Sequence, residues 1–196
     1  MNYLSHFFLS TDATSDVHLG NFLGDIVRKS TADALPESIR KGIDLHRFID
    51  QFTDNHKLVL DGKRLLYPQF GKYASVILDV YFDFLLIENW STYQDQPVQE
   101  FMDGCYEFVD ANMDYIPDIA KNRVQAMNSA KWMNGYISDG GRKDLFGRLA
   151  RRAKYDKNFG SAVEIYASEK TALSVIHQEF FPILQNSCAS WLDNNF

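Results

Sequence analysis

The chain has 196 residues, 45% of them hydrophobic and 23% charged, which is enough for one globular domain with its own core. Its net charge of −6 argues against general nucleic-acid binding, because phosphate backbones require a basic surface. No apolar stretch approaches the roughly 20 residues of a membrane span, and the first residues lack the basic leader and cleavage site of a signal peptide. We therefore expect a single cytoplasmic domain over residues 1–196, without nucleic-acid or membrane partners, and the sequence leaves its oligomeric state open.

The spacing of hydrophobic residues predicts helices throughout the chain and almost no strands. Five prolines and 11 glycines suit long helices joined by short connections. In chain order we predict a short turn at 3–9 and helices at about 16–28, 36–50, 58–66, 72–90, 97–113, 117–132, 141–153 and 161–194, the last with a candidate break at Pro182. The two cysteines, Cys105 and Cys188, lie far apart and are expected to be reduced core thiols. The predicted fold class is an all-α helical bundle.

The first candidate site follows one face of the long helix predicted at 36–50 and the residues just after it. His46, Asp50 and Asp54 are each four residues apart, so a helix places them in a row. A histidine followed one turn later by a carboxylate offers nitrogen and oxygen to a single divalent ion. The alternative is an ordinary solvated polar face, and this segment alone does not decide between the two.

Two further aspartates, Asp79 and Asp83, stand four residues apart in an apolar run. A helix that is hydrophobic all round is a buried helix, and an unpaired buried carboxylate is costly. These carboxylates must therefore be paired, hydrogen-bonded or bound to metal. One alternative pairs them with arginines such as Arg47 or Arg64. A cation shared with the His46 face explains them more economically.

Asp25 is the only acid in an apolar helical stretch, and beside the other two segments it is a candidate ligand. His6 is a candidate as well, although a lone histidine on an apolar face is more often a satisfied core residue. The remaining histidines are expected to be surface or structural residues: His18, His56 and His177. The candidates form a set of hard oxygens with one or two imidazoles and no thiolate, which suits Mn²⁺ or Mg²⁺ and, less specifically, iron or zinc. A metal held in this way typically polarises a phosphoryl oxygen and activates water, so phosphate-ester hydrolysis is the first reaction class to consider.

One concentrated basic segment contrasts with the acidic remainder of the chain. Residues 142–157 hold seven basic and two acidic residues, a local charge of +5, and the rest of the chain carries −11. Within the segment, Arg148, Arg151 and Arg152 are spaced to share one face of a helix. Such a patch can steer an acidic partner, and the alternative is a solvated basic helix.

Four motifs stand in order over nearly the whole chain: NYLSH at 2–6, GNFLGDIVR at 20–28, HRFIDQFTD at 46–54 and DVYFD at 79–83. They resemble the motifs of the acyl carrier protein phosphodiesterases, a divergent, circularly rearranged relative of the HD phosphohydrolases. The resemblance implies an all-helical, HD-phosphohydrolase-like domain with rearranged topology and a manganese-type cofactor. It also implies cleavage of the phosphodiester that joins 4′-phosphopantetheine to a serine of acyl carrier protein.

The resemblance implies roles for the candidate residues. The ion, Mn²⁺ with Mg²⁺ or Fe²⁺ as alternatives, would be held by one histidine and three aspartates: Asp25, His46, Asp50 and Asp79. Asp83 would be a further ligand or general base, and Arg47 would contact the phosphate or pair with an aspartate. His6 and Asp54 are candidate further ligands. The acidic carrier protein would dock on the arginines of the basic segment: Arg148, Arg151 and Arg152.

The chain departs from the family pattern at two positions. The family's apolar helix carries a histidine directly after its second aspartate, where this chain has Phe84, and the family can carry another histidine near the start, where this chain has Phe8. Because the loss of an imidazole beside a metal would weaken the ligand set, two alternatives stay open. The chain could be a carrier-protein-binding module with little or no hydrolase activity, or a hydrolase of small phosphodiesters.

Overall fold

Helices form every regular element in the computed structural model, which describes residues 1–155 and 158–195. The α-helices are α1 (Tyr3–Leu9), α2 (Ser15–Leu23), α3 (Lys29–Ala32), α4 (Glu37–Asn55), α5 (Lys57–Phe70), α6 (Ala74–Glu88), α7 (Val98–Ala111), α8 (Asp118–Ser129), α9 (Asp139–Arg152) and α10 (Ala162–Asn195). Short 3₁₀ segments connect several of them: η1 (Gly71–Tyr73), η2 (Trp90–Thr92), η3 (Met113–Tyr115), η4 (Trp132–Tyr136) and η5 (Phe159–Ser161). The predicted all-α fold is confirmed for the described residues.

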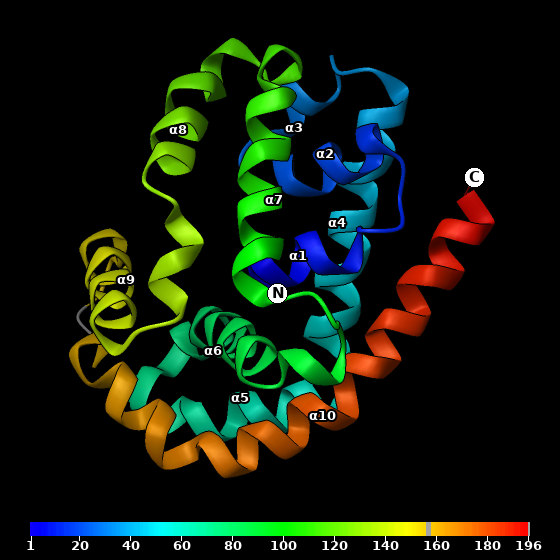
Figure 1. Cartoon of the computed structure of the whole chain (residues 1–196). Coiled ribbons are helices and arrows are strands. Elements are labelled where there is room, and N and C mark those ends of the chain that lie inside the picture. The colour runs from blue at the N-terminus through cyan, green and yellow to red at the C-terminus, as the bar shows by residue number, and fades with distance from the viewer. Residues whose placement is uncertain (156–157, 196) are drawn as a thin grey trace.

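Two largely buried helices, α1 and α6, come from distant parts of the chain. Figure 1 shows α1 in the middle of the molecule, with α2, α4 and α7 around it and α5, α6 and α10 below it. Every residue from Leu4 to Leu9 of α1 is buried, and so is every residue from Val80 to Leu86 of α6. Both cysteines are buried free thiols, as predicted. The contact between α1 and α6 therefore fixes the start of the chain against the core.

The helix predicted at 16–28 ends earlier, at Leu23. A turn follows, in which the amides of Ile26 and Val27 donate to the Leu23 carbonyl oxygen at 2.9 and 3.0 Å. Gly24 stands at this end, and glycine is a weak helix former. A Cβ on Gly24 would also lie 2.2 Å from Cγ of His46, so only a residue without a side chain fits against that ring. The acid that follows therefore projects from a turn and not from a helix.

The break expected at Pro182 is not found. α10 continues from Ala162 to Asn195 with Pro182 inside it, and Figure 1 shows the helix changing direction toward its C-terminal part. Proline lacks an amide proton and its ring crowds the preceding turn, which bends a helix without always ending it.

Two glycines let α2 and α4 cross with their backbones in contact. A Cβ on Gly20 would lie 2.0 Å from a carbonyl oxygen of α4, and one on Gly42 would lie 2.2 Å from a carbonyl oxygen of α2. No other residue fits at either position unless the helices separate. This close crossing brings Asn21 of α2 next to His46 of α4, where the candidate site forms.

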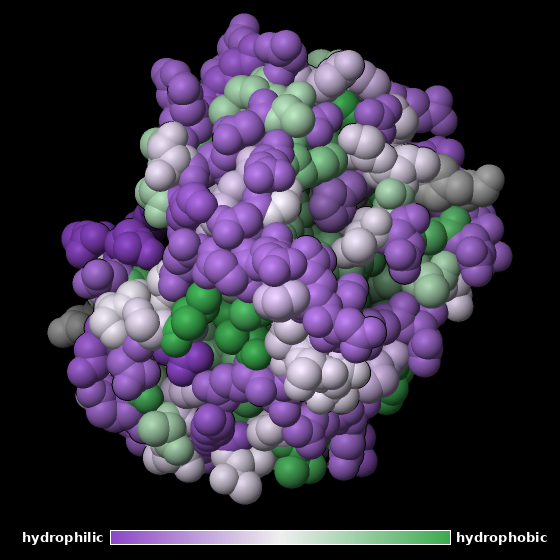
Figure 2. Space-filling model, in the orientation of Figure 1, coloured by the Kyte–Doolittle hydropathy of each residue, from purple (hydrophilic) through white to green (hydrophobic). Residues whose placement is uncertain are grey.

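The outer surface is polar over most of the visible face. Figure 2 shows mainly hydrophilic residues there, with small and separate hydrophobic areas. Isolated exposed apolar residues of this kind are ordinary on protein surfaces. Among the described residues, no helix combines the length and the hydropathy that a membrane crossing would need.

His177 of α10 is fully buried, and neither of its ring nitrogens has a hydrogen-bond partner in the described part of the chain. Its ring stacks on Phe181 with 4.9 Å between centroids, and burial lowers its pKa from 6.5 to about 3. The folded protein keeps the ring neutral at pH values at which the unfolded chain binds a proton. The stability that depends on His177 is therefore present above pH 6.5 and is lost as the pH falls from 6.5 toward 3.

Replacing His177 with phenylalanine is expected to raise the free energy of unfolding at pH 7 by about 1 kcal/mol, since an unsatisfied buried polar group costs roughly 1–3 kcal/mol. Below pH 6.5 the advantage of the variant should grow by up to about 1.4 kcal/mol per pH unit, the slope for one proton. Urea unfolding of both proteins at several pH values measures this. Parallel stability curves would show that His177 is protonated equally in both states.

Candidate active site

Two histidine rings stack where α1, α2 and α4 meet. The centroids of His6 and His46 are 3.9 Å apart, with 13° between the ring planes. Asn21 of α2 holds both: Nδ1 of His46 donates to its backbone carbonyl oxygen at 2.8 Å, and Nδ1 of His6 donates to its side-chain oxygen at 2.9 Å. The Asn21 side chain is itself fixed, because its nitrogen donates to the His6 carbonyl oxygen at 2.7 Å and to the Ser10 hydroxyl at 2.9 Å. With both Nδ1 atoms protonated, the neutral rings carry their lone pairs on Nε2.

The two Nε2 atoms meet the carboxylate of Asp50. Each lies 3.2 Å from one of its oxygens, and Nε2 of His46 also lies 3.4 Å from an oxygen of Asp25. His6, His46 and Asp50 thus each offer one ligand atom within 4.8 Å of the other two. Lone pairs that face carboxylate oxygens repel them unless a proton or a cation lies between. Histidines oriented by a second hydrogen bond, beside a carboxylate, fit a divalent ion.

The pKa values of the histidines and aspartates also show that the carboxylates favour a positive charge beside them. Burial disfavours a charged ring, but the carboxylates of Asp25 and Asp50 raise the pKa of His46 to about 9. Burial and the neighbouring His46 lower the pKa of His6 to about 4. Burial opposes ionisation of Asp50 as well, yet the two histidines and the α-amino group of Met1 hold the pKa of Asp50 well below its ordinary value. The carboxylates therefore stay charged and attract whichever cation is present.

Asp79 faces the same region from α6. One of its carboxylate oxygens lies 3.2 Å from the α-amino group of Met1, which also lies 3.1 Å from Asp50. Burial raises the pKa of Asp79, and this amino group opposes the rise. Asp50 of α4 and Asp79 of α6, both predicted as ligands, thus contact the same positively charged amino group.

Asp83 is placed differently from the ligand or general base that the sequence suggests. It is fully buried, and its oxygens accept hydrogen bonds from the amides of Leu4 and Ser5 at 3.0 and 3.1 Å and from the Ser5 hydroxyl at 2.5 Å. These are amides of the first turn of α1, which have no partner within their own helix. Burial raises the pKa of Asp83 to about 7, against the effect of these hydrogen bonds. The carboxylate holds the helix that carries His6, and the geometry gives no support to a role as ligand.

Arg47 also lies away from the histidines, and its position does not support contact with a phosphate. Its guanidinium pairs at 2.9 Å with an aspartate one turn earlier on α4, where both side chains are more than half exposed. Arg64 likewise pairs within α5, so neither arginine reaches the aspartates of α6. The alternative explanation of the apolar run by salt bridges to these two residues is therefore wrong. Asp54 does line the cavity beside the site, and it pairs with Lys63 at 2.7 Å.

The two positions at which the family pattern has histidines point into the core. Phe84 is fully buried, and the guanidinium carbon of Arg142 lies 4.3 Å from its ring centroid. Phe8 packs against Trp90, with 5.5 Å between ring centroids. Neither phenylalanine lines the cavity. In this chain, the absence of histidines at these positions takes no ligand from the group of His6, His46 and Asp50.

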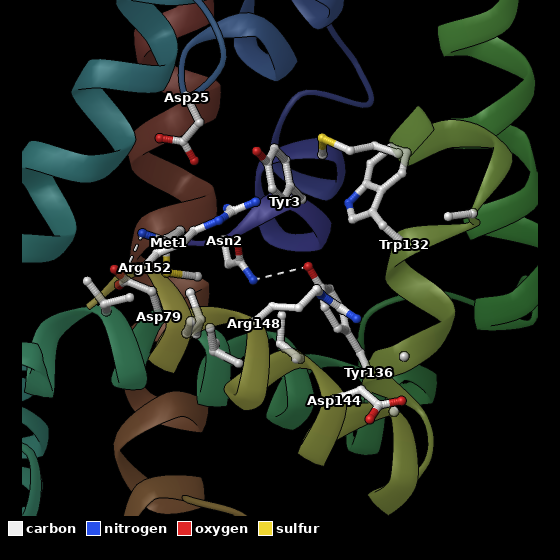
Figure 3. A pocket seen from close by; sticks show the side chains of 18 of the residues that line it. Met1, Asn2, Tyr3, Asp25, Asp79, Trp132, Tyr136, Asp144, Arg148 and Arg152 are labelled. Carbon is white, nitrogen blue, oxygen red and sulfur yellow. Dashed lines mark hydrogen bonds and ion pairs between the residues drawn. The ribbon is translucent and has the colours of Figure 1, made fainter. Parts of the chain in front are cut away.

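A cavity of about 800 Å³ opens beside the aspartates. Asp25, Asp50 and Asp79 lie at its carboxylate end, and α8, η4 and α9 form much of the remaining wall. Figure 3 shows Tyr3 and Asn2 between Asp25 at one end and Asp144 at the other. A cavity of this size can enclose a small organic ligand.

Three arginines line this cavity: Arg123 of α8 and Arg148 and Arg152 of α9. None of them forms an ion pair with a carboxylate in the described part of the chain. Burial and the carboxylate of Asp25 raise the pKa of Tyr3, and the positive charges of Arg123 and Arg152 oppose the rise. All four arginines are exposed, but Arg151 does not line the cavity. Of the basic set predicted to share one docking face, two residues therefore line the cavity and one lies outside it.

Several groups of the site were not predicted from the sequence, among them Asn21, Arg123, Trp132 and the α-amino group of Met1. Asn21 carried a usable signal, because a buried amide in an apolar stretch must have hydrogen-bond partners. Arg123 carried none, since it lies on a helix outside the basic segment. Of the remaining histidines, His18 binds Ser10 at 2.8 Å and His56 accepts a hydrogen bond at the start of α5, so both are structural as predicted.

Comparisons with known proteins agree on one family. The family model described as acyl carrier protein phosphodiesterase matches residues 1–184. The acyl carrier protein phosphodiesterase of Pectobacterium atrosepticum is 29% identical over 184 residues, which cover 93% of this chain and 94% of that protein. Those of Shigella boydii serotype 18 and Escherichia coli O157:H7 are 32% and 31% identical over 187 residues, with the same coverage. No solved structure matches. The chain therefore belongs to the acyl carrier protein phosphodiesterase family.

Proposed function

We propose that this chain is a metal-dependent phosphodiesterase. It would hydrolyse the bond between 4′-phosphopantetheine and the serine of holo-acyl carrier protein, releasing apo-acyl carrier protein and 4′-phosphopantetheine. The family and the names of its relatives support the substrate. The proposed metal dependence rests on one observation. The Nε2 atoms of His6 and His46 each lie 3.2 Å from the Asp50 carboxylate, beside a cavity lined by arginines. The all-helical fold with a His/Asp site also supports the proposed relation to HD phosphohydrolases.

The ion would be held by His6, His46 and Asp50, with Asp25 and Asp79 as candidate further ligands. Imidazoles together with carboxylates, and no thiolate, suit Mn²⁺ or Fe²⁺, whereas Mg²⁺ prefers oxygen ligands alone. When bound, the ion would polarise the phosphoryl oxygens and activate a water molecule for attack on phosphorus. The part of Asn21 is to keep both rings in one tautomer and orientation.

The arginines of the cavity would bind the anionic part of the substrate. Arginine recognises phosphate through two parallel hydrogen bonds and keeps its charge at any physiological pH. The positive charges of Arg123 and Arg152 both lower the pKa of the Tyr3 phenol, so their electrostatic effect extends to the carboxylate end of the cavity. A chain of net charge −6 that leaves three cavity arginines without carboxylate partners in its described residues is suited to an anionic ligand.

Intact-mass analysis tests the function directly. Holo-acyl carrier protein incubated with the purified protein and Mn²⁺ should lose the mass of 4′-phosphopantetheine, and the loss should stop when a chelator is added. An unchanged mass together with measurable carrier-protein binding would indicate the binding module. Cleavage of small phosphodiesters in the absence of any cleavage of holo-acyl carrier protein would indicate a hydrolase of small phosphodiesters.

Replacing both Arg148 and Arg152 with alanine is expected to lower kcat/KM for holo-acyl carrier protein by about 10–100-fold. Hydrogen bonds to charged groups contribute roughly 1.5–3 kcal/mol, which corresponds to this factor. Hydrolysis of a small phosphodiester such as bis(p-nitrophenyl) phosphate should fall similarly, because both residues line the cavity.

The matched control is Arg151→Ala, on the same helix but outside the cavity. It should change KM by less than about fivefold, and only for the protein substrate, since a surface charge outside the cavity acts mainly on the salt-sensitive rate of encounter. Steady-state kinetics at two salt concentrations make the comparison. Equal losses in both variants, confined to the protein substrate, would mean that all three arginines form an outer docking surface.

A further inference from the structure

The cavity is larger than a phosphate group and a metal ion require, and its two ends differ in chemistry. Asp25 and Arg152 lie near Tyr3 at one end, and Figure 3 shows Asp144 and Tyr136 toward the other. The volume of about 800 Å³ falls in the range of roughly 300–1,000 Å³ found for pockets that enclose organic ligands. Space therefore remains beyond the phosphate for a chain attached to it.

The wall between the two ends is largely apolar. α9 presents Leu145 and Leu149 to the cavity, one turn apart, and each is followed three residues later by a cavity arginine. Further apolar side chains complete this wall: Val76 and Val80 of α6 and Met127 of α8. Val76 is 44% exposed, and both leucines are only partly buried. Covering these side chains with the hydrocarbon part of a ligand would be favourable.

One polar side chain on the same path, that of Asn2, can form a further hydrogen bond. The side-chain nitrogen of Asn2 donates to the Tyr136 hydroxyl at 3.1 Å, which leaves the Asn2 side-chain oxygen as an acceptor. The indole nitrogen of Trp132 is buried and has no acceptor among the described residues, and Figure 3 shows it on the side of the ring that faces Tyr3. The free oxygen of Asn2 can accept a hydrogen bond from the N–H of an amide in the ligand.

We infer that this half of the cavity binds the chain that stays attached to the phosphate, an extended organic chain carrying amide groups. Leu145, Leu149 and Trp132 would thereby determine which phosphodiesters are accepted. The inference rests on the proposed function, in which that chain is the pantetheine arm. The phosphate lies at the end with the ligand group, Arg123 and Arg152, and the arm runs toward Arg148 and Tyr136. The carrier protein is too large to enter, so it remains outside on the serine side of the phosphorus.

Calorimetric titration of the whole protein with Mn²⁺ present tests this with two probes, 4′-phosphopantetheine and inorganic phosphate. The wild type is expected to bind 4′-phosphopantetheine at least about tenfold more tightly than phosphate. Leu149→Gln makes the wall polar without adding charge and should remove most of that preference while phosphate affinity stays unchanged. Ala150→Gln, on the next residue and outside the cavity lining, should bind both probes as the wild type does.

Met127→Gln, on a different helix of the wall, is a second variant in case Leu149→Gln fails to fold, and thermal melting identifies the folded proteins. Equal affinity of the wild type for both probes, or an unchanged preference in a folded wall variant, overturns the inference. The mass assay separates this outcome from failure of the proposed function. Cleavage of holo-acyl carrier protein without any preference for the arm would reject the inference alone, whereas the preference without cleavage would reject the hydrolysis alone.

Discussion

Replacing Asp50 with asparagine is expected to abolish metal binding and to lower kcat/KM by more than about a hundredfold, since changes to outer partners of a metal site alone cost 10–100-fold. Asp50 contacts His6, His46 and the Met1 amino group at 3.1–3.2 Å, so one carboxylate holds both histidines and the amino group together. Asparagine keeps the size of the side chain but removes its charge, which a hard cation needs. Elemental analysis of the purified proteins and steady-state kinetics measure the two effects.

Thermal melting adds a readout that is independent of activity. Metal that binds only the folded wild type should stabilise it by about 2.7 kcal/mol at a hundredfold excess over the dissociation constant, and the Asp50→Asn variant should show no such gain. Asp44→Asn is the control, because Asp44 lies on the same helix but pairs with Arg47 at the surface. A variant lacking Asp50 that still bound one ion per chain would place the metal elsewhere.

Replacing Gly42 with alanine should lower the free energy of unfolding by about 3 kcal/mol, near the upper end of the usual cost of overpacking. The new Cβ would lie 2.2 Å from a carbonyl oxygen of α2 and 2.7 Å from Cα of Gly20. Both obstacles are backbone, so no side-chain rotation relieves them and the helices must move apart. The melting temperature should fall by roughly 6–12 °C for a domain of this size.

The same substitution should weaken metal binding in the protein that remains folded. Asn21, next to Gly20 on α2, orients both histidine rings, and it would move with its helix. Gly104→Ala is the matched control, because a Cβ there meets nothing within 4 Å and alanine is the better helix former. That variant should gain up to about 1 kcal/mol. If the two substitutions changed the melting temperature equally, the α2–α4 crossing would not be tightly packed.

Local periodicity accounts for the part of the site that could be predicted from the sequence. His46 and Asp50 stand one turn apart on a long helix, and a helix places them together whatever surrounds it. The aspartate of the apolar run at position 79 follows from the cost of burying a carboxylate. The all-helical class follows from the same periodicity and from the scarcity of strand-like alternation.

Tertiary packing decided the rest, and local spacing could not reveal it. Asp83 shares a helix face with Asp79, but one turn further along that face the neighbour is the start of α1, whose amides take up the carboxylate. Arg148 and Arg151 look equivalent in the sequence, and only the position of α9 beside the cavity separates them. The part played by His6 likewise depends on the docking of α1 against α2 and α6, which brings distant segments together.

The way in which α1 is held has a consequence for the order of events during synthesis. His6 leaves the ribosome well before the groups that fix its helix, since Asp83 follows Leu4 and Ser5 by 79 and 78 residues. Phe8 on the same helix packs against Phe181 of α10, which is synthesised later still. Before α6 is synthesised, α1 can pack against α2, but the amides at its start lack the carboxylate of Asp83. The packing that places His6 beside His46 is therefore completed only after segments far along the chain have been synthesised.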